Sequence, residues 1–435
     1  MNVAEQRAAL ADGAERPFEF GRSYANYALG VLLGVSIFNL TDRAILAFLL
    51  VPIAQELHLS DGQLGLIAGP AFGIFYALSQ IPIARFADRG SRVNVIALAL
   101  AFWSAMTALQ SFAAGFLTLA LARAAVAMGE AGSGPASQSM LSDTFPPSQR
   151  TRAFAVLAFQ APLGAALGAL AGGWGREYLG WRGALLLVGI PGLVFAVLTW
   201  RTLKEPTRGY FTPRAQERTA SLAETVRFLF SLPSLRHLVI GYSVWVTVAA
   251  GTTFDPVFLE RSFALKGSQI GSLVGIAGML AMVGYFLGGW LADRLAIRDP
   301  SWVMRLPPIF LMLHLVVSAT YYLAPNKTVL IAMLLTGPFL PGTLPLILAT
   351  MQNLAPPHMR ARATALLLTI STLVGMSIGP PLVGAISDSL APSLGIESMR
   401  YALLSVVSIG WTWAALHYWL GSRTLTRDLA AKDGA

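Results

Sequence analysis

The 435-residue chain is 55% hydrophobic and only 12% charged, with a mean hydropathy of +0.61. This composition predicts a multi-pass membrane protein and excludes an ordinary soluble enzyme. The net charge is +9, but the basic residues follow membrane topology, so we expect no nucleic-acid partner. The absence of cysteine excludes disulfides and thiolate metal sites, and the five scattered histidines give no metal-ligand pattern. We therefore expect neither a metal nor a cofactor.

Apolar segments of about twenty residues recur twelve times along the chain, and each can cross about 30 Å of hydrocarbon as a helix. About 23 mostly polar residues precede the first segment, and that segment is too long for the hydrophobic region of a signal peptide, so it is expected to remain as a helix. The predicted helices cover residues 24–51, 64–84, 93–112, 115–142, 153–173, 183–203, 236–259, 268–292, 304–324, 328–352, 362–386 and 399–421.

Lysine and arginine are distributed unevenly between the predicted loops. Of the 31 such residues, 23 fall in the termini and even-numbered loops and only six in the odd-numbered loops. The positive-inside rule therefore predicts that both termini lie in the cytoplasm, and we expect the membrane to be the plasma membrane. The long central loop includes a short amphipathic helix, expected near Ser221 to Phe230. The predicted organisation is an N-terminal cytoplasmic segment (1–23), a six-helix bundle (24–203), a cytoplasmic linker (204–235), a second six-helix bundle (236–421) and a cytoplasmic tail (422–435).

The first predicted helix carries an acid and a base at membrane depth, in the run Asn39-Leu40-Thr41-Asp42-Arg43. Each such charge costs roughly 3 kcal/mol even on insertion scales, so we expect both to face protein or a water-filled cavity. Helical spacing places Asn39, Asp42 and Arg43 on one face. A functional site is one interpretation. The other is a structural ion pair that only joins this helix to its neighbours.

Glycines spaced by four recur in every third predicted helix. Such small-residue spacing lets helix backbones approach closely in lipid, and its period fits a three-helix unit used four times. The glycines are Gly65, Gly69 and Gly73 in helix 2, Gly164, Gly168 and Gly172 in helix 5, Gly271, Gly275, Gly284 and Gly288 in helix 8, and Gly375 and Gly379 in helix 11.

The fourth predicted helix holds a second acid and base, Arg123 and Glu130. Seven residues make two helical turns, so both side chains share a face about 10.5 Å apart. Together with Asp42 and Arg43 they form a formally neutral group, which we call the quartet, confined to the first half of the chain. Glycine and proline interrupt this helix at Gly129–Pro135 and helix 10 at the corresponding place, which indicates a central binding site.

The second half has no comparable charge in mid-membrane and offers aromatic and methionine side chains instead. This contrast suits an amphiphile whose acidic head meets Arg43 or Arg123 while its tail lies on the apolar wall. For each apolar residue, packing between helices or against lipid is the alternative. The expected cavity lining is Phe38, Tyr76, Tyr242, Trp245, Met279 and Phe339.

A few charges fall at the predicted outer ends of helices 7 and 11. Asp255 and Glu260, together with Arg261 and Asp388, are candidates for an outer gate. Ordinary charges at the membrane boundary are the alternative.

Two loops share a motif, Ala84-Arg85-Phe86-Ala87-Asp88-Arg89-Gly90-Ser91-Arg92 after helix 2 and Gly289-Trp290-Leu291-Ala292-Asp293-Arg294-Leu295 after helix 8. Both resemble the G-x-L-A-D-R-x-G-R signature of the major facilitator superfamily, although Ala84 replaces the leading glycine and the second copy lacks the final glycine and arginine. The resemblance implies an all-α membrane fold of twelve helices in two pseudo-symmetric six-helix bundles. Without it, both motifs are simply solvated turns. It also implies a cytoplasmic gate, made between the bundles when the inner side is closed, from Asp88, Arg89, Arg92, Asp293 and Arg294.

Closer matches narrow the resemblance to the spinster-type lysolipid transporters. The matching runs are Asn39-x-x-Asp42-Arg43, Phe102-Trp103-Ser104, Arg123 with Gly129-Glu130-Ala131, and Ala161-Pro162-Leu163-Gly164. The resemblance implies a monomeric, proton-coupled carrier of an anionic lysolipid by alternating access in a bacterial inner membrane, with membrane lipids, the lysolipid and protons as partners. Asp42 and Glu130 would be the coupling carboxylates. Arg43, Arg123 and Asn39 would hold the head group or the carboxylates.

Three other functions fit parts of the sequence. A proton-driven efflux antiporter for drugs or small organic solutes would use the acids to bind cargo directly. A membrane enzyme is suggested by Gly375-Met376-Ser377-Ile378-Gly379, but this G-x-S-x-G pattern lies mid-helix and repeats the glycine spacing, so we expect no catalysis. The chain has no phosphate-binding loop for ATP. A receptor or scaffold would keep the helices but show no flux.

Overall fold

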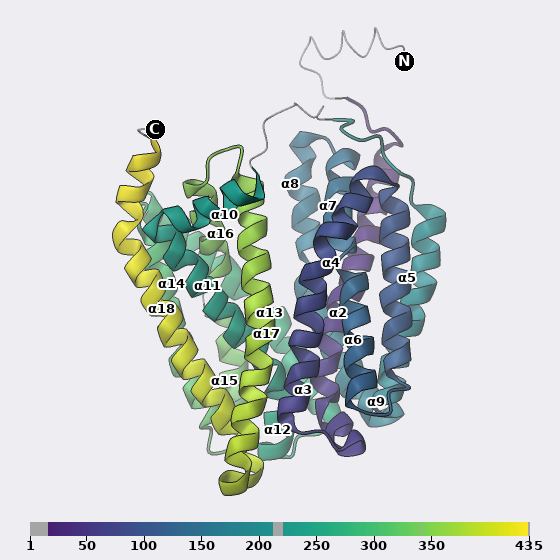
Figure 1. Ribbon diagram of the computed structural model, residues 1–435, viewed down its shortest axis with the longest axis vertical. Coiled ribbons are helices and arrows are strands. Elements are labelled where there is room, and N and C mark those ends of the chain that lie inside the picture. Colours follow the sequence, from purple (N-terminus) through teal and green to yellow (C-terminus); the bar gives the residue numbers. More distant parts are fainter. Residues whose placement is uncertain (1–15, 212–220, 341, 434–435) are drawn as a thin grey trace.

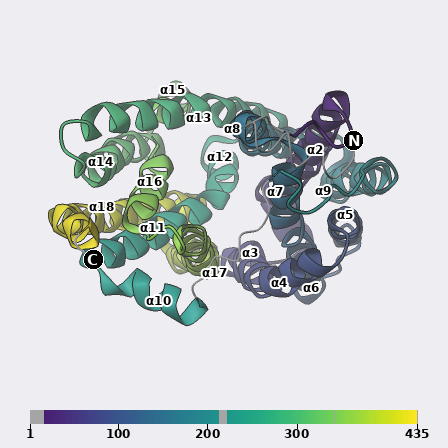
Figure 2. The same cartoon turned by 90° about the horizontal axis from the view of Figure 1, so that it is seen from above.

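The computed structural model describes residues 16–211, 221–340 and 342–433, and all regular elements in this part of the chain are helices (Figure 1). Two groups of helices stand side by side (Figures 1 and 2). The first group, which we call the first lobe, comprises α2 (Arg22–Leu57), α3 (Asp61–Ala68), α4 (Pro70–Arg89), α5 (Arg92–Gln110), α6 (Phe116–Glu130), α7 (Ser133–Thr144), α8 (Pro147–Ala158) and α9 (Gln160–Thr202).

The second lobe contains the remaining helices and three short 3₁₀ turns. It comprises α10 (Leu222–Ser231), α11 (Pro233–Gly251), η1 (Thr252–Phe254), α12 (Asp255–Phe263), α13 (Gly267–Ala296), α14 (Trp302–Tyr322), α15 (Lys327–Thr336), η2 (Gly337–Phe339), α16 (Leu344–Leu354), α17 (Arg360–Leu394), η3 (Gly395–Glu397) and α18 (Ser398–Asp433). The α10 helix confirms the short helix expected in the central loop, and Ser221 and Glu224 form its capping box.

Nine helical segments among the described residues are long and apolar enough to cross a membrane. Two of them are long enough for two crossings. Pro147–Thr202 spans 56 residues and is interrupted by the non-helical Gly180, whereas Arg360–Ala430 spans 71 residues and contains both α17 and α18. A further crossing is divided into α6 and α7, each too short to be counted alone. The arrangement is therefore consistent with the twelve predicted crossings.

The breaks predicted in helices 4 and 10 are present. The α6 helix ends at Glu130 and α7 begins at Ser133, while α15, η2 and α16 divide helix 10. Pro135 lies in the first turn of α7, where its missing N–H removes no helical hydrogen bond. At each break, helix ends replace a continuous helix, and Glu130 at the end of α6 is buried.

The glycine runs lie where helix backbones meet, as their spacing predicts. A Cβ atom built on Gly164 would lie 2.5 Å from the Cβ of Leu40, and one on Gly168 would lie 2.6 Å from the Cβ of Ala44, so α9 can approach α2 only with glycine there. Between the lobes, a Cβ on Gly69 would lie 2.4 Å from the carbonyl oxygen of Met376 in α17. The close α2–α9 contact fixes the helix face that carries Asp42 and Arg43.

Candidate functional site

The quartet forms two ion pairs that cross between α2 and α6. The Arg43 Nε of α2 donates to Oε2 of Glu130 in α6 at 2.5 Å, and Nη1 of Arg123 in α6 lies 3.6 Å from Oδ1 of Asp42 in α2. Asp42, Arg123 and Glu130 are each at most 3% exposed. Each helix therefore supplies one acid and one base, and each acid is neutralised by the base of the other helix.

An aromatic wall on α4 holds both guanidinium groups. The ring centroid of Phe72 lies 5.1 Å from Cζ of Arg43 and 4.6 Å from Cζ of Arg123. Tyr76, one turn further along α4, lies 4.4 Å from Cζ of Arg43 and stacks on Phe72. These distances lie within the range of cation–π interactions, and such interactions are stronger when they are shielded from water. The sequence analysis found Tyr76 but missed Phe72, whose signal was its position four residues earlier on the same helix face.

Several polar atoms of the site have no hydrogen-bond partner within the described part of the chain. Thr107 of α5 donates a hydrogen bond to Oδ2 of Asp42, but Oδ1 of Asp42, Oε1 of Glu130 and Nδ2 of Asn39 accept or donate none. A buried polar atom left unpaired costs roughly 1–3 kcal/mol. The site therefore keeps hydrogen-bonding capacity for a proton, a water molecule or a ligand. Thr107 was not singled out from the sequence, where one threonine in an apolar helix gives little signal.

Arg43 is the most accessible member of the quartet. Its side chain is 25% exposed, whereas that of Glu130 behind it is fully covered. The α4 helix, which carries the aromatic wall, also packs against the second lobe: a Cβ on Gly73 would lie 2.9 Å from the Cβ of Met376 in α17. The quartet thus lies one helix away from the contact between the lobes, and Arg43 separates Glu130 from the surface.

The six residues predicted to line a cavity lie in different surroundings. Phe38 packs on Phe195 in the first-lobe core, with ring centroids 5.3 Å apart. Tyr242 is buried, and its ring stacks on that of Trp245 in the same helix, α11. Trp245 borders a cavity of about 140 Å³ between α11, α13 and the α15–α16 break. Met279 and Phe339 are 39% and 45% exposed.

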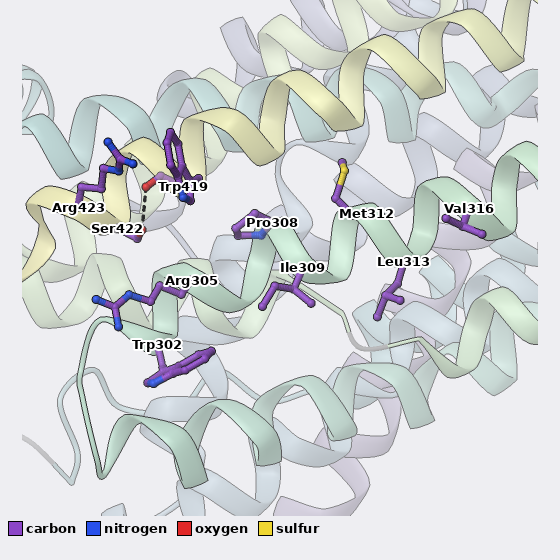
Figure 3. A pocket seen from close by; sticks show the side chains of 10 residues that line it. All are labelled: Trp302, Arg305, Pro308, Ile309, Met312, Leu313, Val316, Trp419, Ser422 and Arg423. Carbon is purple, nitrogen blue, oxygen red and sulfur yellow. Dashed lines mark hydrogen bonds between the residues drawn. The ribbon is translucent and has the colours of Figure 1, made fainter.

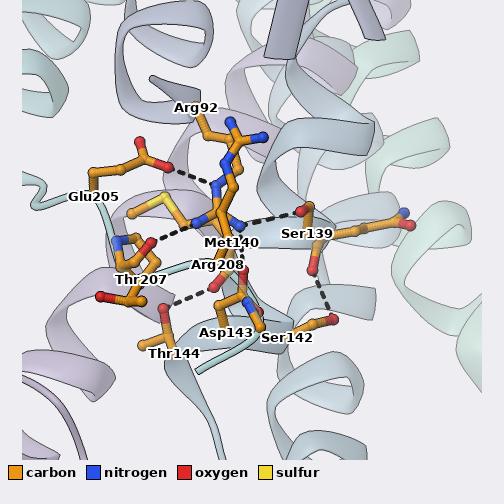
Figure 4. A network of polar contacts seen from close by, with 12 residues as sticks. Arg92, Ser139, Met140, Ser142, Asp143, Thr144, Glu205, Thr207 and Arg208 are labelled. Carbon is orange, nitrogen blue, oxygen red and sulfur yellow. Dashed lines mark hydrogen bonds and ion pairs between the residues drawn. The ribbon is translucent and has the colours of Figure 1, made fainter. Parts of the chain in front are cut away.

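Arg92, from the first loop motif, is buried in a polar network of its own lobe (Figure 4). Its Nε donates to Glu205 at 2.6 Å, its Nη1 to Asp143 at 2.5 Å, and its Nη2 to the Pro206 carbonyl at 2.7 Å. Burial opposes ionisation of Glu205, but hydrogen bonds from the Val93 amide and Arg92 hold its pKa below the ordinary value. The network fastens the chain after α9 to α5 and α7. Neither Asp143 nor Glu205 was found from the sequence.

Three other residues of the predicted cytoplasmic gate have described side chains, and these lie outside such a network. Arg89, Asp293 and Arg294 are exposed, and Arg294 lies 5.5 Å from the ring of Trp290. Asp88 belongs to α4, but its side chain lies outside the described residues. In this conformation Arg92 therefore contacts its own lobe, and a latch between the lobes stays a prediction for a different conformation.

Charged side chains join the lobes at the end of the molecule opposite the termini. Arg176 of α9 pairs with Glu260 of α12 at 2.6 Å, and Arg261 donates two hydrogen bonds to Asp61 of α3 at 2.7 and 2.8 Å. Asp388 of α17 accepts hydrogen bonds from the backbone amides of Asp61 and Gly62, at the start of α3.

Asp255 differs from the other outer-gate candidates, since it accepts a hydrogen bond from Tyr322 within the second lobe. Glu260, Arg261 and Asp388 connect the lobes. Their partners in the first lobe, Arg176 and Asp61, could not be recognised from the sequence because the pairing depends on how the lobes dock.

Comparison with known proteins gives a consistent set of relatives. The profile of the Major Facilitator Superfamily matches residues 32–380. An "MFS-type efflux pump" of Mycolicibacterium smegmatis is 34% identical over 434 residues, covering 98% of both chains, and "Protein spinster homolog 1" of Xenopus tropicalis is 27% identical, covering 87% of this chain and 77% of that protein. A crystal structure of a bacterial homolog of the human lysosomal transporter Spinster, described as inward-facing and unoccupied, superposes with a TM-score of 0.84 at 28% identity, covering 94% of this chain and 99% of that one.

Proposed function

Because the chain belongs to the major facilitator superfamily and is a transporter related to spinster proteins and efflux pumps, we propose that it moves an anionic, lysolipid-like amphiphile by proton-coupled alternating access. The observation that carries this proposal is the crossed quartet. Its two acids and two bases have a net charge of zero. Some of its polar atoms lack a hydrogen-bond partner, and an aromatic wall lies beside it. Such an arrangement can exchange one charge for another at little net electrostatic cost.

The exchange follows from how each acid is neutralised. An anionic head group that reaches Arg43 competes with Glu130 for the same guanidinium. A buried carboxylate that loses its counter-ion is too costly to keep charged and is neutralised by a proton. Binding of the anion at Arg43 therefore drives proton uptake at Glu130. Asp42, paired with Arg123 and hydrogen-bonded to Thr107, is the second coupling carboxylate, and Asn39 offers a donor to the head group.

Alternating access requires that one side be closed while the other is open. We propose that the Arg176–Glu260 and Arg261–Asp61 pairs close the outer side, while Arg92 is held within the first lobe. This agrees with the similarity to a bacterial structure described as inward-facing. The proposed setting is a bacterial inner membrane with both termini in the cytoplasm, and the Asp88, Arg89, Asp293 and Arg294 gate closes in the opposite conformation.

A proton-driven efflux antiporter for drugs or other small organic solutes is the second candidate. The relative from Mycolicibacterium smegmatis, named an efflux pump and matched over 98% of both chains, favours it. In that case a cationic cargo would pair with Asp42 or Glu130 directly, and the arginines would be displaced. Binding of anionic and cationic amphiphiles with the same chain length separates the two candidates, since only one sign of head group should bind tightly.

The test is transport into liposomes under an imposed pH gradient, with a lysophosphatidic acid as the probe. We expect Glu130→Gln to abolish the dependence of its uptake on the pH gradient. Glu56→Gln is the control, because Glu56, on α2, is a glutamate outside the quartet that is 48% exposed and pairs with Arg182. Unchanged, gradient-driven transport in both Glu130→Gln and Asp42→Asn would refute coupling through the quartet.

A further inference from the structure

A long groove follows the outer surface of the second lobe between α14 and α18 (Figure 3). Its volume is about 780 Å³. Ile309, Leu313 and Val316 line it and are between 46% and 66% exposed, although they belong to a membrane-crossing helix. The stretch from Arg305 to Val316 covers about 16 Å of helix, roughly half of the 30 Å hydrocarbon thickness. The groove therefore faces lipid and has the length of one leaflet.

One end of this α14–α18 groove is basic and aromatic, whereas the rest is apolar (Figure 3). Cζ of Arg423 lies 3.7 Å from the ring centroid of Trp419, and Cζ of Arg305 lies 6.0 Å from that of Trp302. Asp299 takes one hydrogen bond from Arg305, whose side chain is nevertheless 45% exposed. Trp and Arg together are typical of the membrane interface. Both guanidinium groups lie at the end of the groove where a lipid head group would lie.

The first lobe contains a corresponding groove without this charge. By the three-helix repeat, α5 and the second half of α9 correspond to α14 and α18. Between them lies a groove of about 350 Å³, lined by Asn94, Ala97, Leu98, Ala101, Ala196, Val197 and Trp200. It has a tryptophan at the same end but no arginine in its lining. The fold therefore produces a groove in both lobes, but only the groove of the second lobe is lined by arginines, namely Arg305 and Arg423.

We propose that the α14–α18 groove binds an anionic glycerophospholipid from the leaflet on the side of the termini. Its phosphate would lie between Arg305 and Arg423, and one acyl chain would lie along Ile309, Leu313 and Val316. Basic pockets between membrane helices on the cytoplasmic side are suited to anionic head groups. The site is separate from the proposed cargo site, since neither α14 nor α18 carries a quartet residue. It does not depend on transport.

The experiment measures lipid retained by the purified full-length chain. Native mass spectrometry follows competition between phosphatidylglycerol and phosphatidylcholine with the same acyl chains. The wild type should retain phosphatidylglycerol in preference, and Arg305→Gln or Arg423→Gln should each reduce that preference about fivefold, with both together reducing it about 25-fold. Arg201→Gln is the matched control: Cζ of Arg201 lies 5.9 Å from the Trp200 ring beside the first-lobe groove. This control should leave the preference unchanged.

A second variant tests the place of the acyl chain. Ile309→Trp should fill the groove and lower retention of both lipids without changing their ratio. Equal retention of the two lipids by the wild type, or an equal loss of preference in Arg201→Gln, would overturn the proposal. So would displacement of the lipid by soluble glycerol 1-phosphate at matched concentration, because the site would then recognise only a phosphate group. If Ile309→Trp retained both lipids as well as the wild type does, the groove would also be excluded as the binding site of the acyl chain.

Discussion

The crossed pairs of the quartet allow a test that separates a functional site from a purely structural ion pair. The perturbation is Arg123→Met, which removes the guanidinium but keeps an apolar side chain of similar length. Asp42 then stays buried with Thr107 as its remaining partner. Breaking a buried pair from one side typically costs 3–5 kcal/mol, because the other charge is left uncompensated.

The geometry gives a similar magnitude. At the 3.6 Å that separate Nη1 of Arg123 from Oδ1 of Asp42, the Coulomb attraction is about 5 kcal/mol for an effective dielectric constant of about 20. Combining Arg123→Met with Asp42→Asn removes both charges, so most of this loss should be recovered. We expect the double variant to be several kcal/mol more stable than Arg123→Met alone. An exposed pair provides the control: Arg305→Met, which leaves Asp299 in solvent, should leave the free energy of unfolding almost unchanged.

The assay combines equilibrium unfolding in detergent, free of anionic lipid, with transport in liposomes. If the pair only joins α2 to α6, the stable double variant should transport normally. If it serves the cargo and the proton, the double variant should be folded but inactive. The reasoning from charge burial is refuted if Arg123→Met is as stable as the wild type, or if neutralising Asp42 gives no recovery.

Three further predictions concern packing, the outer contact and the network around Arg92. Gly168→Leu should prevent the normal approach of α9 to α2 and lower folded yield in size-exclusion chromatography, whereas Gly30→Leu, with no atom within 4 Å, should not. Arg261→Gln removes two hydrogen bonds to Asp61 and should open the outer end, measured as faster labelling of a cysteine introduced there; unchanged labelling would argue against a gate. The lowered pKa of Glu205 means that its stabilising contribution is complete above its unfolded pKa and is lost as the pH falls through the folded value, so Glu205→Gln should flatten the acid limb of a stability–pH profile.

The architecture was accessible from the sequence because membrane crossing imposes a simple length and hydropathy requirement. The apolar segments, the glycine spacing and the breaks beside Pro135 and near Phe339 all correspond to features of the structure. The same is true of the isolated charges Asp42 and Glu130, since an ionisable residue in an apolar helix needs a protein partner. Each of these signals lies within one segment of the chain.

The partners of those charges were harder to predict from the sequence. The sequence placed Arg123 and Glu130 on one face of a helix, but it could not show that each pairs with the other helix, because that depends on the rotation of α2 against α6. Phe72 carried no signal beyond its helix position. The docking of the lobes likewise decides that Asp61 meets Arg261. Contacts between segments far apart in sequence were therefore the part that required coordinates.

The α2 helix connects the quartet to the contacts between the lobes at the end of the molecule opposite the termini. Arg43 lies five residues before Phe48, about 7.5 Å along the helix. The carbonyl oxygen of Phe48 accepts a hydrogen bond from Nη1 of Arg176 at 2.8 Å, and Nη2 of the same side chain pairs with Glu260 of the second lobe at 2.6 Å. A shift of α2 that accompanies loss of the Arg43–Glu130 pair would move the acceptor on which Arg176 depends. Because one rigid helix takes part in both arrangements, a charge exchange at the quartet can bias the contact between the lobes without any separate signalling element.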